Sequence, residues 1–458
     1  MLSFDPGDDR YLRDLAEFVA IESVSRDAPP ATMRRAAEWL RLQLDFANAE
    51  VVGTGGHPLV RGELRGPEGA PTVLVYGHYD VQPPGALEEW SAPPFQLTRD
   101  GELVRGRGVS DDKGPSYIAV QVARAFAAQE GRAPLHLKFL FEGEEEIGSP
   151  HLPDFLKDHA AELSADLVIS ADGAMWRPDE PSVATGSKGL LELELEVTGA
   201  NRDLHSGRYG GAVANPLHAL ARLIAGLHDQ EGRVAVPGFY AGIPELSLKR
   251  RLEIRAIAFD EDEYRRELGL PALFGEPGYS PLERLWERPT LEVNGVEGGG
   301  AYTVIPHRAR AHITCRLVLG QEPEAVLAAI TGHLRAQPAP GLTISIAPHP
   351  GGAAAYTLGE DHRALGAAVA ALEAVYPRER VLLTKIGGTL PAAALFQELL
   401  GLKTLFFSFS TADERLHAPN EFFRVRRLRE GMRAWEWLLR ELAAGPHRLS
   451  APTSAEAA

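Results

Sequence analysis

The sequence is poor in cysteine and in long apolar runs. Its single cysteine, Cys315, excludes an intrachain disulfide and a zinc site built from cysteines. No stretch approaches the ~18 consecutive apolar residues of a membrane-spanning helix, so we expect no such helix. The first residues, MLSFDPGDDRYL, are acidic and lack the charged-then-apolar pattern of a signal peptide, which favours a cytoplasmic location.

Basic residues are outnumbered by acidic ones. The chain has 47 Lys and Arg against 63 Asp and Glu, which gives a formal net charge of −16 over 458 residues. Because nucleic acids and anionic membranes bind basic patches, this balance argues against both as partners. It is compatible with an acidic cleft that holds cations. The length is sufficient for two or three domains, each with its own core.

Short apolar runs and helical patterns alternate in the first and last parts of the chain. Helices are predicted at 9–22, 31–47 and about 115–130, and again near 361–376, 391–400 and 424–443. Runs of strand length, rich in β-branched or aromatic residues, are TVLVYG (72–77), LHLKFLF (135–141), DLVIS (166–170) and KTLFFSF (403–409). Nearly continuous apolar runs of this length suit strands buried on both faces, so we predict an α/β domain.

A different pattern begins near residue 188. LLELELEV (190–197) alternates apolar and acidic residues, as a half-exposed strand does. A helix follows, with Asn215 as its N-cap and Pro216 at its first position. HITCRLVL and LTISIAPH indicate two more strands. We therefore predict a first domain made of 1–187 and 357–444, an inserted α+β domain at 188–356, and a disordered tail at 445–458.

Histidines and carboxylates follow the predicted strands of the first domain. In open α/β sheets, binding sites form at the carboxyl ends of strands. Four strand ends carry such residues, and a fifth loop, just before the helix at 115–130, offers two more aspartates. Such a concentration of histidine and carboxylate needs cations to neutralise it, so one metal-binding cleft is expected. The residues concerned are His78 and Asp80, Asp111 and Asp112, Glu144 to Glu146, Asp172 and His417.

The stretch FLFEGEEEIGS (139–149) holds four glutamates within five residues. Taken alone, such a run is typical of a solvated acidic turn. Beside the other strand ends, however, at least two of these glutamates are expected to face metal. Glu142 and Glu144 are interpreted as structural.

Six motifs together resemble the M20 metallopeptidases, most closely the carnosinase-like dipeptidase branch. The resemblance spans nearly the whole chain. It implies an α/β fold in which a mixed-sheet catalytic domain binds two metals and carries an inserted α+β lid or dimerisation domain. The motifs are GHYDVQP (77–83), GRGVSDDKGP (106–115), EGEEEIGS (142–149), the loop of Asp172, RDLHSGRYGG (202–211) and LHAPNE (416–421).

The resemblance also implies a ligand set. His78 and Asp172 would hold one divalent ion, Glu146 and His417 the other, and Asp111 would bridge them. The three ligand carboxylates would carry a charge of −3 and the two divalent ions a charge of +4, so one hydroxide would balance the site. Zinc is the first choice because imidazole and carboxylate suit it, with manganese and cobalt as alternatives.

Three further residues would take part in the chemistry if the resemblance holds. Asp80 would accept the second ring N–H of His78 and fix its tautomer. Glu145 would be the general base that takes a proton from the attacking water and passes it to the leaving amine. His205 would stabilise the oxyanion. The Asp111–Asp112 peptide bond is expected to be cis, as in the family.

Four residues are candidates for substrate binding. Arg316 matches an arginine that clamps the terminal carboxylate of the substrate, which bidentate geometry suits, although a structural ion pair also explains an arginine there. Thr303 matches a nearby substrate contact. In KIGGTLP (385–391), Gly388 and Thr389 precede a predicted helix, where free N–H groups can bind a carboxylate or carbonyl.

The predicted activity is metal-dependent hydrolysis of the amide bond in dipeptides or short peptides with a free C-terminal carboxylate. The alternative is an N-acyl-amino-acid deacylase or desuccinylase on the same scaffold, since a fold does not set the acyl group. A non-catalytic binding homologue is a further alternative. The resemblance also implies a homodimer in which His205 reaches the site of the partner.

Overall fold

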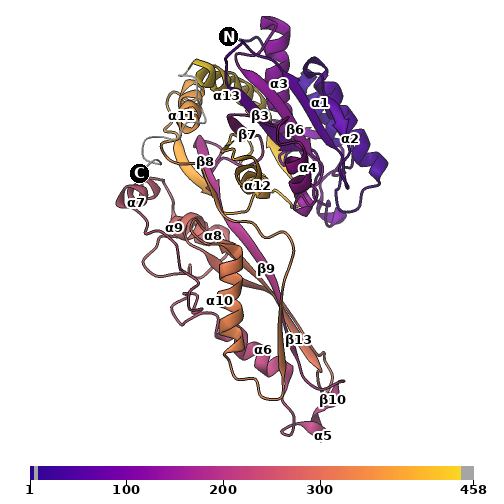
Figure 1. Ribbon diagram of the computed structural model, residues 1–458, viewed down its shortest axis with the longest axis vertical. Helices are drawn as coiled ribbons and strands as arrows, with labels where there is room; N and C mark the ends of the chain where they lie inside the picture. The colour runs from indigo at the N-terminus through magenta and orange to yellow at the C-terminus, as the bar shows by residue number, and fades with distance from the viewer. Residues whose placement is uncertain (5–8, 445–458) are drawn as a thin grey trace. The chain divides into compact units, whose positions relative to one another are not determined.

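The computed structural model describes residues 1–4 and 9–444, so the predicted tail lies outside the described residues. The chain forms two compact units (Figure 1). Unit 1 comprises the chain up to Gly186, Leu358–Ile386 and the part from Pro391 onward. Unit 2 comprises Ser187–Thr357 together with the four residues Gly387–Leu390. These boundaries lie next to the expected 188 and 356, but the short piece at 387–390 was assigned from the sequence to the first domain.

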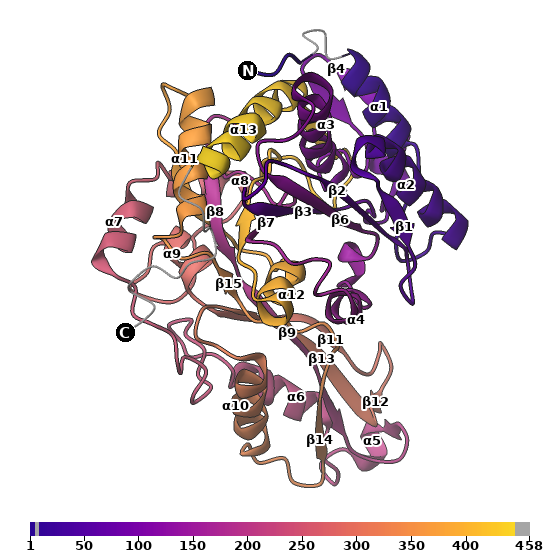
Figure 2. The same ribbon diagram turned by 45° about the horizontal axis from the view of Figure 1, so that its top comes forward.

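Unit 1 is built on a mixed sheet whose strands follow the order β1-β2-β6-β3-β7-β17-β8, with β16 also paired with β8 (Figure 2). β3, β6, β7 and β17 run parallel, whereas β1, β2 and β8 join antiparallel. The mixed sheet agrees with the predicted fold class. The strands are β1 (Glu50–Val52), β2 (Leu59–Leu64), β3 (Thr72–His78), β6 (His136–Glu142), β7 (Leu167–Ser170), β8 (Ser182–Ser187), β16 (Leu382–Ile386) and β17 (Thr404–Phe406).

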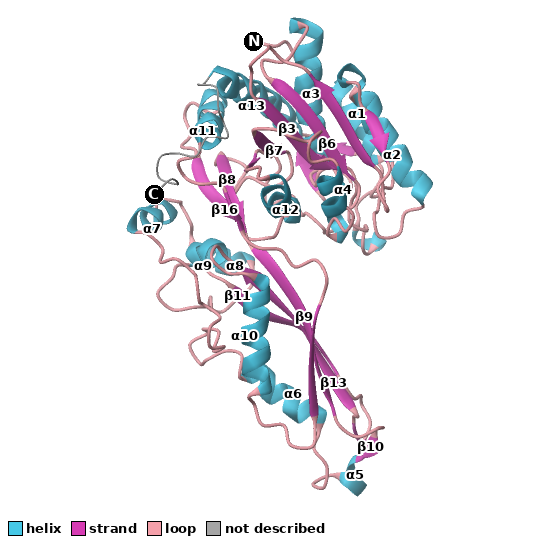
Figure 3. Ribbon diagram, in the orientation of Figure 1, coloured by secondary structure: helices cyan, strands magenta, loops and turns pink. Residues whose placement is uncertain are grey.

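Helices cover both faces of this sheet. On one face, α4 (Leu152–Asp158) and α12 (Pro391–Leu400) enclose a core with Leu74, Tyr76 and Val168 of the strands. On the other, α2 (Pro30–Gln43) contacts β2 and α3 (Lys113–Glu130) contacts β3. The helices α1 (Asp9–Val19) and α13 (Val425–Ala444) pack on α3, and α11 (Arg363–Val375) packs on α13 (Figure 3). Strands covered on both sides must be apolar throughout, which explains the continuous apolar runs.

Several predicted elements differ in extent, and the helices predicted at 9–22 and 31–47 end earlier, at Val19 and Gln43. α3 begins at Lys113, two residues before Pro115. Proline is tolerated there because the N–H groups of the first helical turn have no partner within the helix. Gly131 ends this helix in the left-handed region, with φ of 73°, as expected of a C-terminal glycine. The strand predicted at 403–409 spans only Thr404–Phe406, and residues 407–409 belong to the loop that follows it.

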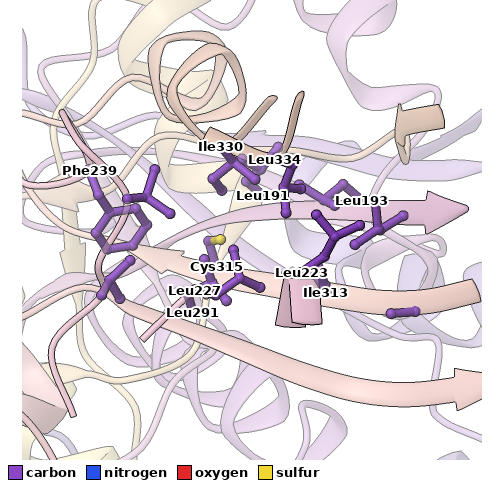
Figure 4. Close-up of a cluster of buried hydrophobic side chains, with 14 of the residues drawn as sticks. Leu191, Leu193, Leu223, Leu227, Phe239, Leu291, Ile313, Cys315, Ile330 and Leu334 are labelled. Atoms are coloured by element: carbon purple, nitrogen blue, oxygen red, sulfur yellow. The ribbon is translucent and has the colours of Figure 1, made fainter. Parts of the chain in front are cut away.

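Unit 2 contains a four-stranded antiparallel sheet in the order β11-β13-β9-β14. In β9 (Gly189–Thr198), buried and partly exposed residues alternate along the whole strand, as the sequence predicted. The buried side packs on α6 (Pro216–Ala225) and α10 (Pro323–Arg335), and Figure 4 shows Leu191, Ile313 and Ile330 in this core. The free Cys315 is buried there too. The other strands of this sheet are β11 (Thr290–Glu297), β13 (Arg308–Leu317) and β14 (Thr343–Pro348).

Shorter elements complete the two units. Those in unit 1 are η1 (Asp45–Ala47), η2 (Leu87–Glu89), β4 (Thr98–Asp100), β5 (Leu103–Arg105), η3 (Glu145–Ile147) and β18 (Phe422–Arg424). Those in unit 2 are β10 (Leu204–His205), α5 (Ser206–Tyr209), α7 (Leu248–Arg255), α8 (Glu261–Glu267), α9 (Pro281–Glu287), β12 (Val304–Ile305) and β15 (Tyr356–Thr357). Among the described residues, no helix is long and apolar enough to cross a membrane.

Candidate metal centre

The parallel strands of unit 1 end at one edge of the sheet, and their ends carry the candidate ligands. His78 is the last residue of β3. Glu146 lies in η3, just after β6, and Asp172 follows β7 by two residues. Because β3 pairs in parallel with both β6 and β7, these three strand ends are neighbours.

Two groups of three residues could each hold a metal ion. One consists of His78, Asp111 and Asp172, and the other of Asp111, Glu146 and His417. Asp111 belongs to both, and its two oxygens face different histidines: Oδ1 lies 3.2 Å from Nε2 of His78, and Oδ2 lies 3.0 Å from Nε2 of His417. The five residues named from the sequence as ligands therefore come together, with the aspartate that was named as the bridge in the shared position.

The two groups differ in exposure. The side chain of His78 is fully buried, whereas that of His417 is 55% exposed. His417 also adopts a φ of 61°, in the left-handed region that residues other than glycine rarely enter. His78 is thus shielded from solvent, whereas His417 is open to it.

The carboxylates of the cluster are electrostatically unfavourable without cations. Burial, reinforced by the charges of Asp111 and Glu146, raises the pKa of Asp172 to about 7. Burial also raises the pKa of Glu145 well above its usual range. Hydrogen bonds to Asp111 and Glu146 raise the pKa of His417 to about 10. Buried negative charge that is only partly compensated favours binding of divalent cations.

The geometry fits such ions. Two ligands of a tetrahedral zinc, each about 2.0–2.1 Å from the ion, lie roughly 3.3 Å apart. The closest approaches of ligand atoms here are 3.0 Å and 3.2 Å within the group of Asp111, Glu146 and His417. Glu146 Oε1 is buried and has no hydrogen-bond partner among the described residues. Imidazole and carboxylate are ligands that suit zinc, manganese and cobalt.

Asp80 connects the first strand end to the glutamate loop. Its carboxylate accepts hydrogen bonds from the backbone N–H groups of Glu145 and Glu146, at 3.3 Å and 3.1 Å. Nδ1 of His78 lies 3.0 Å from the backbone carbonyl oxygen of Asp80 and 3.3 Å from its carboxylate. The sequence suggested only the contact between this carboxylate and His78. Asp80 also fixes the backbone of Glu145 and Glu146.

The other two glutamates of the acidic stretch are buried among protein donors. Glu142 accepts hydrogen bonds from the hydroxyls of Tyr76 at 2.6 Å and Ser149 at 2.9 Å. Glu144 accepts one from the backbone N–H of His57 and lies 2.8 Å from Nδ1 of His151. Neither belongs to a metal-binding group, in line with their interpretation as structural.

Unit 2 brings two other candidates together. His205 lies at the end of β10, which pairs with β12, and the backbone N–H and hydroxyl of Ser206 both donate to the carbonyl oxygen of Thr303 at 2.9 Å. His205 and Thr303 are both exposed. The ring of His205 is oriented by a hydrogen bond of 3.1 Å from the backbone N–H of Gly207 to its Nδ1.

The remaining candidates also lie in unit 2. Arg316, near the end of β13, donates from Nη1 to the hydroxyl of Thr389 at 2.8 Å. The carbonyl oxygen of Gly388 accepts from the backbone N–H of Lys188. Burial lowers the pKa of the Arg316 guanidinium and the charge of Glu192 opposes this shift, but Arg316 forms no ion pair with any of the described residues. The structural ion pair that the sequence left open for Arg316 is therefore absent among the described residues.

Three residues that support the site have no role predicted from the sequence. Gln82 donates to Glu146 Oε2 at 2.8 Å. Arg107 and Glu421 form a buried ion pair, 2.7 Å long, next to Asp111. Each lies inside a motif quoted for the resemblance, but a buried pair between motifs separated by 314 residues leaves no signal in a single sequence. The Asp111–Asp112 peptide bond is cis, as expected.

Comparisons with known proteins identify the family of this chain. The family described as peptidase family M20/M25/M40 matches residues 74–441. The Cys-Gly metallodipeptidase DUG1 of Saccharomyces cerevisiae is 30% identical over 82% of this chain and 80% of the relative. The structure of the M20 family metallo-carboxypeptidase Sso-CP2 from Sulfolobus solfataricus has a TM-score of 0.85 and 30% identity, covering 95% of this chain and 99% of that one.

A third relative supports the branch suggested by the motifs. Human carnosine dipeptidase 1 superposes with a TM-score of 0.79 at 27% identity, over 95% of this chain and 96% of its own. The resemblance noted from the sequence, including its branch, is thereby confirmed. The chain belongs to peptidase family M20/M25/M40.

Proposed function

We propose that this chain is a two-metal hydrolase that cleaves the amide bond of dipeptides with a free C-terminal carboxylate. The observation that carries the proposal is the pair of metal-binding groups that share Asp111. A carboxylate common to two sites is the arrangement of co-catalytic metal centres. The relatives named as a Cys-Gly metallodipeptidase and a carnosine dipeptidase support the choice of small peptides as substrates.

The proposed ligands are His78 and Asp172 on one side, Glu146 and His417 on the other, and Asp111 between them. Zinc is the proposed metal, with manganese or cobalt as substitutes. When bound, divalent ions would polarise the scissile carbonyl and lower the pKa of the attacking water toward about 7.

Glu145 is the proposed general base. It belongs to neither metal-binding group, and burial raises the pKa of its carboxylate well above the usual range, with the charge of His78 opposing this shift and that of Asp172 adding to it. Asp80 holds its backbone N–H. In this role, the carboxylate accepts a proton from the attacking water and delivers it to the nitrogen of the leaving amine.

Arg316 is the proposed partner of the C-terminal carboxylate of the substrate, with Thr389 and the backbone of Gly388 beside it. A half-buried guanidinium with no carboxylate partner among the described residues can form a bidentate pair with a bound carboxylate. Thr389 already accepts one of its N–H groups and so orients the planar group.

We propose His205 as the group that stabilises the oxyanion, with Thr303 as a substrate contact next to it. Both are exposed, so in an isolated subunit neither lies in a closed pocket. The proposed assembly is a two-fold homodimer in which the partner subunit's His205 completes each site. The proposed location is the cytoplasm.

A panel of substrates on metal-reconstituted protein tests this function. We expect dipeptides to be hydrolysed faster than tripeptides or N-acyl amino acids, and elemental analysis to find about two divalent ions per chain. Metal-stripped protein should be inactive and should recover when zinc or manganese is added back. Full activity in protein shown to be free of metal would refute the proposal.

The same panel separates the alternatives. Faster cleavage of N-acetyl or N-succinyl amino acids would favour a deacylase or desuccinylase. Because the chain resembles a metallo-carboxypeptidase, the panel must also contain longer peptides. Release of the C-terminal residue from these peptides at a higher rate than the hydrolysis of dipeptides would favour a carboxypeptidase. No hydrolysis of any substrate by protein that binds two ions would indicate a binding homologue.

Replacing Arg316 by methionine should weaken catalysis only for substrates that carry a free carboxylate. Loss of one desolvated charge-assisted pair costs on the order of 2–5 kcal/mol, which should appear as a lower kcat/KM on dipeptides. C-amidated dipeptides have no charge to bind there, so they should be affected much less. Arg308→Met, an exposed arginine on the same strand, is the matched control. Equal losses on both substrate types would contradict the proposed role.

A further inference from the structure

We propose that Glu421 is a positioning residue that holds the Asp111 loop in the geometry required for Asp111 to serve both metal ions. The proposal rests on the function proposed above. Glu421 belongs to neither metal-binding group, and its side chain is fully buried. It acts through the backbone that carries the shared ligand.

The carboxylate of Glu421 accepts four hydrogen bonds from one short loop. Oε1 accepts from the backbone N–H groups of Ser110 at 2.9 Å and Asp111 at 3.1 Å. Oε2 accepts from the backbone N–H of Gly108 at 2.9 Å and from Nη1 of Arg107 at 2.7 Å. One side chain thus organises residues 107–111, ending at the N–H of the bridging aspartate itself.

The same ion pair also supports the segment of His417. Nη2 of Arg107 donates to the carbonyl oxygen of Ala418 at 3.3 Å, directly after His417. Glu421 follows His417 by four residues, and its own carbonyl oxygen accepts from the backbone N–H of Gly106. His417 and Asn420 both lie in the left-handed region, so this segment depends on its contacts to keep its shape. The Arg107–Glu421 pair therefore connects the loops of two ligands.

Glutamine at position 421 cannot reproduce this pattern. The carboxylate accepts on both oxygens, whereas an amide accepts on one oxygen and presents N–H groups on the other side. Whichever way the amide turns, its NH₂ group faces two donors, either Ser110 and Asp111 or Gly108 and Arg107. Glu421→Gln therefore loses two hydrogen bonds while it keeps the volume of the side chain, and the Asp111 loop shifts.

The alternative is that Glu421 only stabilises the fold. A buried carboxylate of that kind is Glu436 in α13, which is also fully buried, accepts hydrogen bonds from the backbone N–H of Leu2 and from Arg440, and is in neither metal-binding group. Glu436→Gln is accordingly the matched control. Replacing a purely structural residue lowers the melting temperature of the metal-free and metal-bound forms alike, because the replacement does not change metal affinity.

The test measures the rise in Tm on addition of Zn²⁺ and the affinity for Zn²⁺ in competition with a chelator. For Glu421→Gln we expect affinity to fall at least about 10-fold at both sites, because they share Asp111, and the metal-induced rise to fall accordingly below that of the wild type. Glu436→Gln should keep the full metal-induced rise. If the glutamine variant does not fold, Glu421→Asp, which keeps the charge opposite Arg107, is measured in the same way.

Each outcome decides between the possibilities. A smaller metal-induced rise in the Glu421 variant than in the Glu436 control supports the positioning role. An undiminished rise and wild-type affinity in the variant, with a lower Tm for both forms, would overturn the positioning role and leave the proposed function intact. A wild-type protein that shows no metal-induced rise at all would overturn both.

Discussion

Replacing Glu145 by glutamine is expected to lower the turnover of dipeptides about 10²–10⁴-fold, which is the usual contribution of general acid–base catalysis. The two metal ions should stay bound, because Glu145 is in neither metal-binding group. Glutamine keeps the size of the side chain and the backbone N–H that Asp80 accepts, but it cannot take up a proton from water at neutral pH. Metal content by elemental analysis and kcat on the reconstituted variant check the two halves of this expectation.

The neighbouring glutamate provides the matched comparison. Glu146→Gln changes the same chemical group one residue further along, but it removes a proposed ligand whose Oε2 lies 3.2 Å from Nε2 of His417. We expect this variant to lose metal affinity, and its activity should recover in part at high zinc concentration. The Glu145 variant should not recover in this way. Near-normal turnover of Glu145→Gln would show that the base is elsewhere. Loss of metal by that variant would instead indicate that Glu145 is the ligand and Glu146 the base.

The strands and helices of unit 1 could be predicted because their environment restricts composition. A strand such as β3, covered on both faces, must be apolar along its length, so TVLVYG stands out from the sequence. The position of the site at one edge of the sheet was also predictable. His78, Glu146 and Asp172 follow three strands, and parallel strands bring their ends together.

The supporting contacts could not be predicted, since they depend on which side chains meet across the fold. The carboxylate of Asp80 accepts backbone N–H groups 65 and 66 residues away, a contact that no spacing rule indicates. The burial of Glu142 depends equally on tertiary structure, because the hydroxyl of Tyr76 reaches it from the neighbouring strand. The grouping of Gly387–Leu390 with unit 2 likewise depends on tertiary contacts rather than on local composition.

Roles for individual residues came from the family resemblance, and the structure supports some of them more directly than others. The ligands of the proposed metal centre are brought together within unit 1. His205, Thr303 and Arg316 all belong to unit 2, which contributes no residue to either metal-binding group. A complete active site of the proposed kind therefore requires both units, and those units can come from one chain or from two.

Mixing two inactive variants is expected to restore activity if the units come from two chains. In Glu145→Ala the proposed base is lost, and in His205→Ala the proposed oxyanion group is lost. When subunits exchange, a mixed dimer has one site with both defects and one site with neither. Random pairing makes about half of the dimers mixed, so roughly a quarter of wild-type activity should return. The measurement is dipeptide hydrolysis before and after exchange, at constant total protein and saturating metal.

The result is informative only when assembly is measured alongside it. Size-exclusion chromatography with light scattering must establish a dimer, and exchange must be shown with differently tagged subunits. Each variant mixed with itself is the control and should stay inactive. If His205 acts in its own chain, every site in the mixed dimer keeps one defect and no activity returns. Recovery in a proven dimer therefore requires each site to take Glu145 from one subunit and His205 from the other, because no pairing within one chain yields an intact site. An absence of recovery in a proven, exchanging dimer would place His205 in its own subunit's site or outside the chemistry.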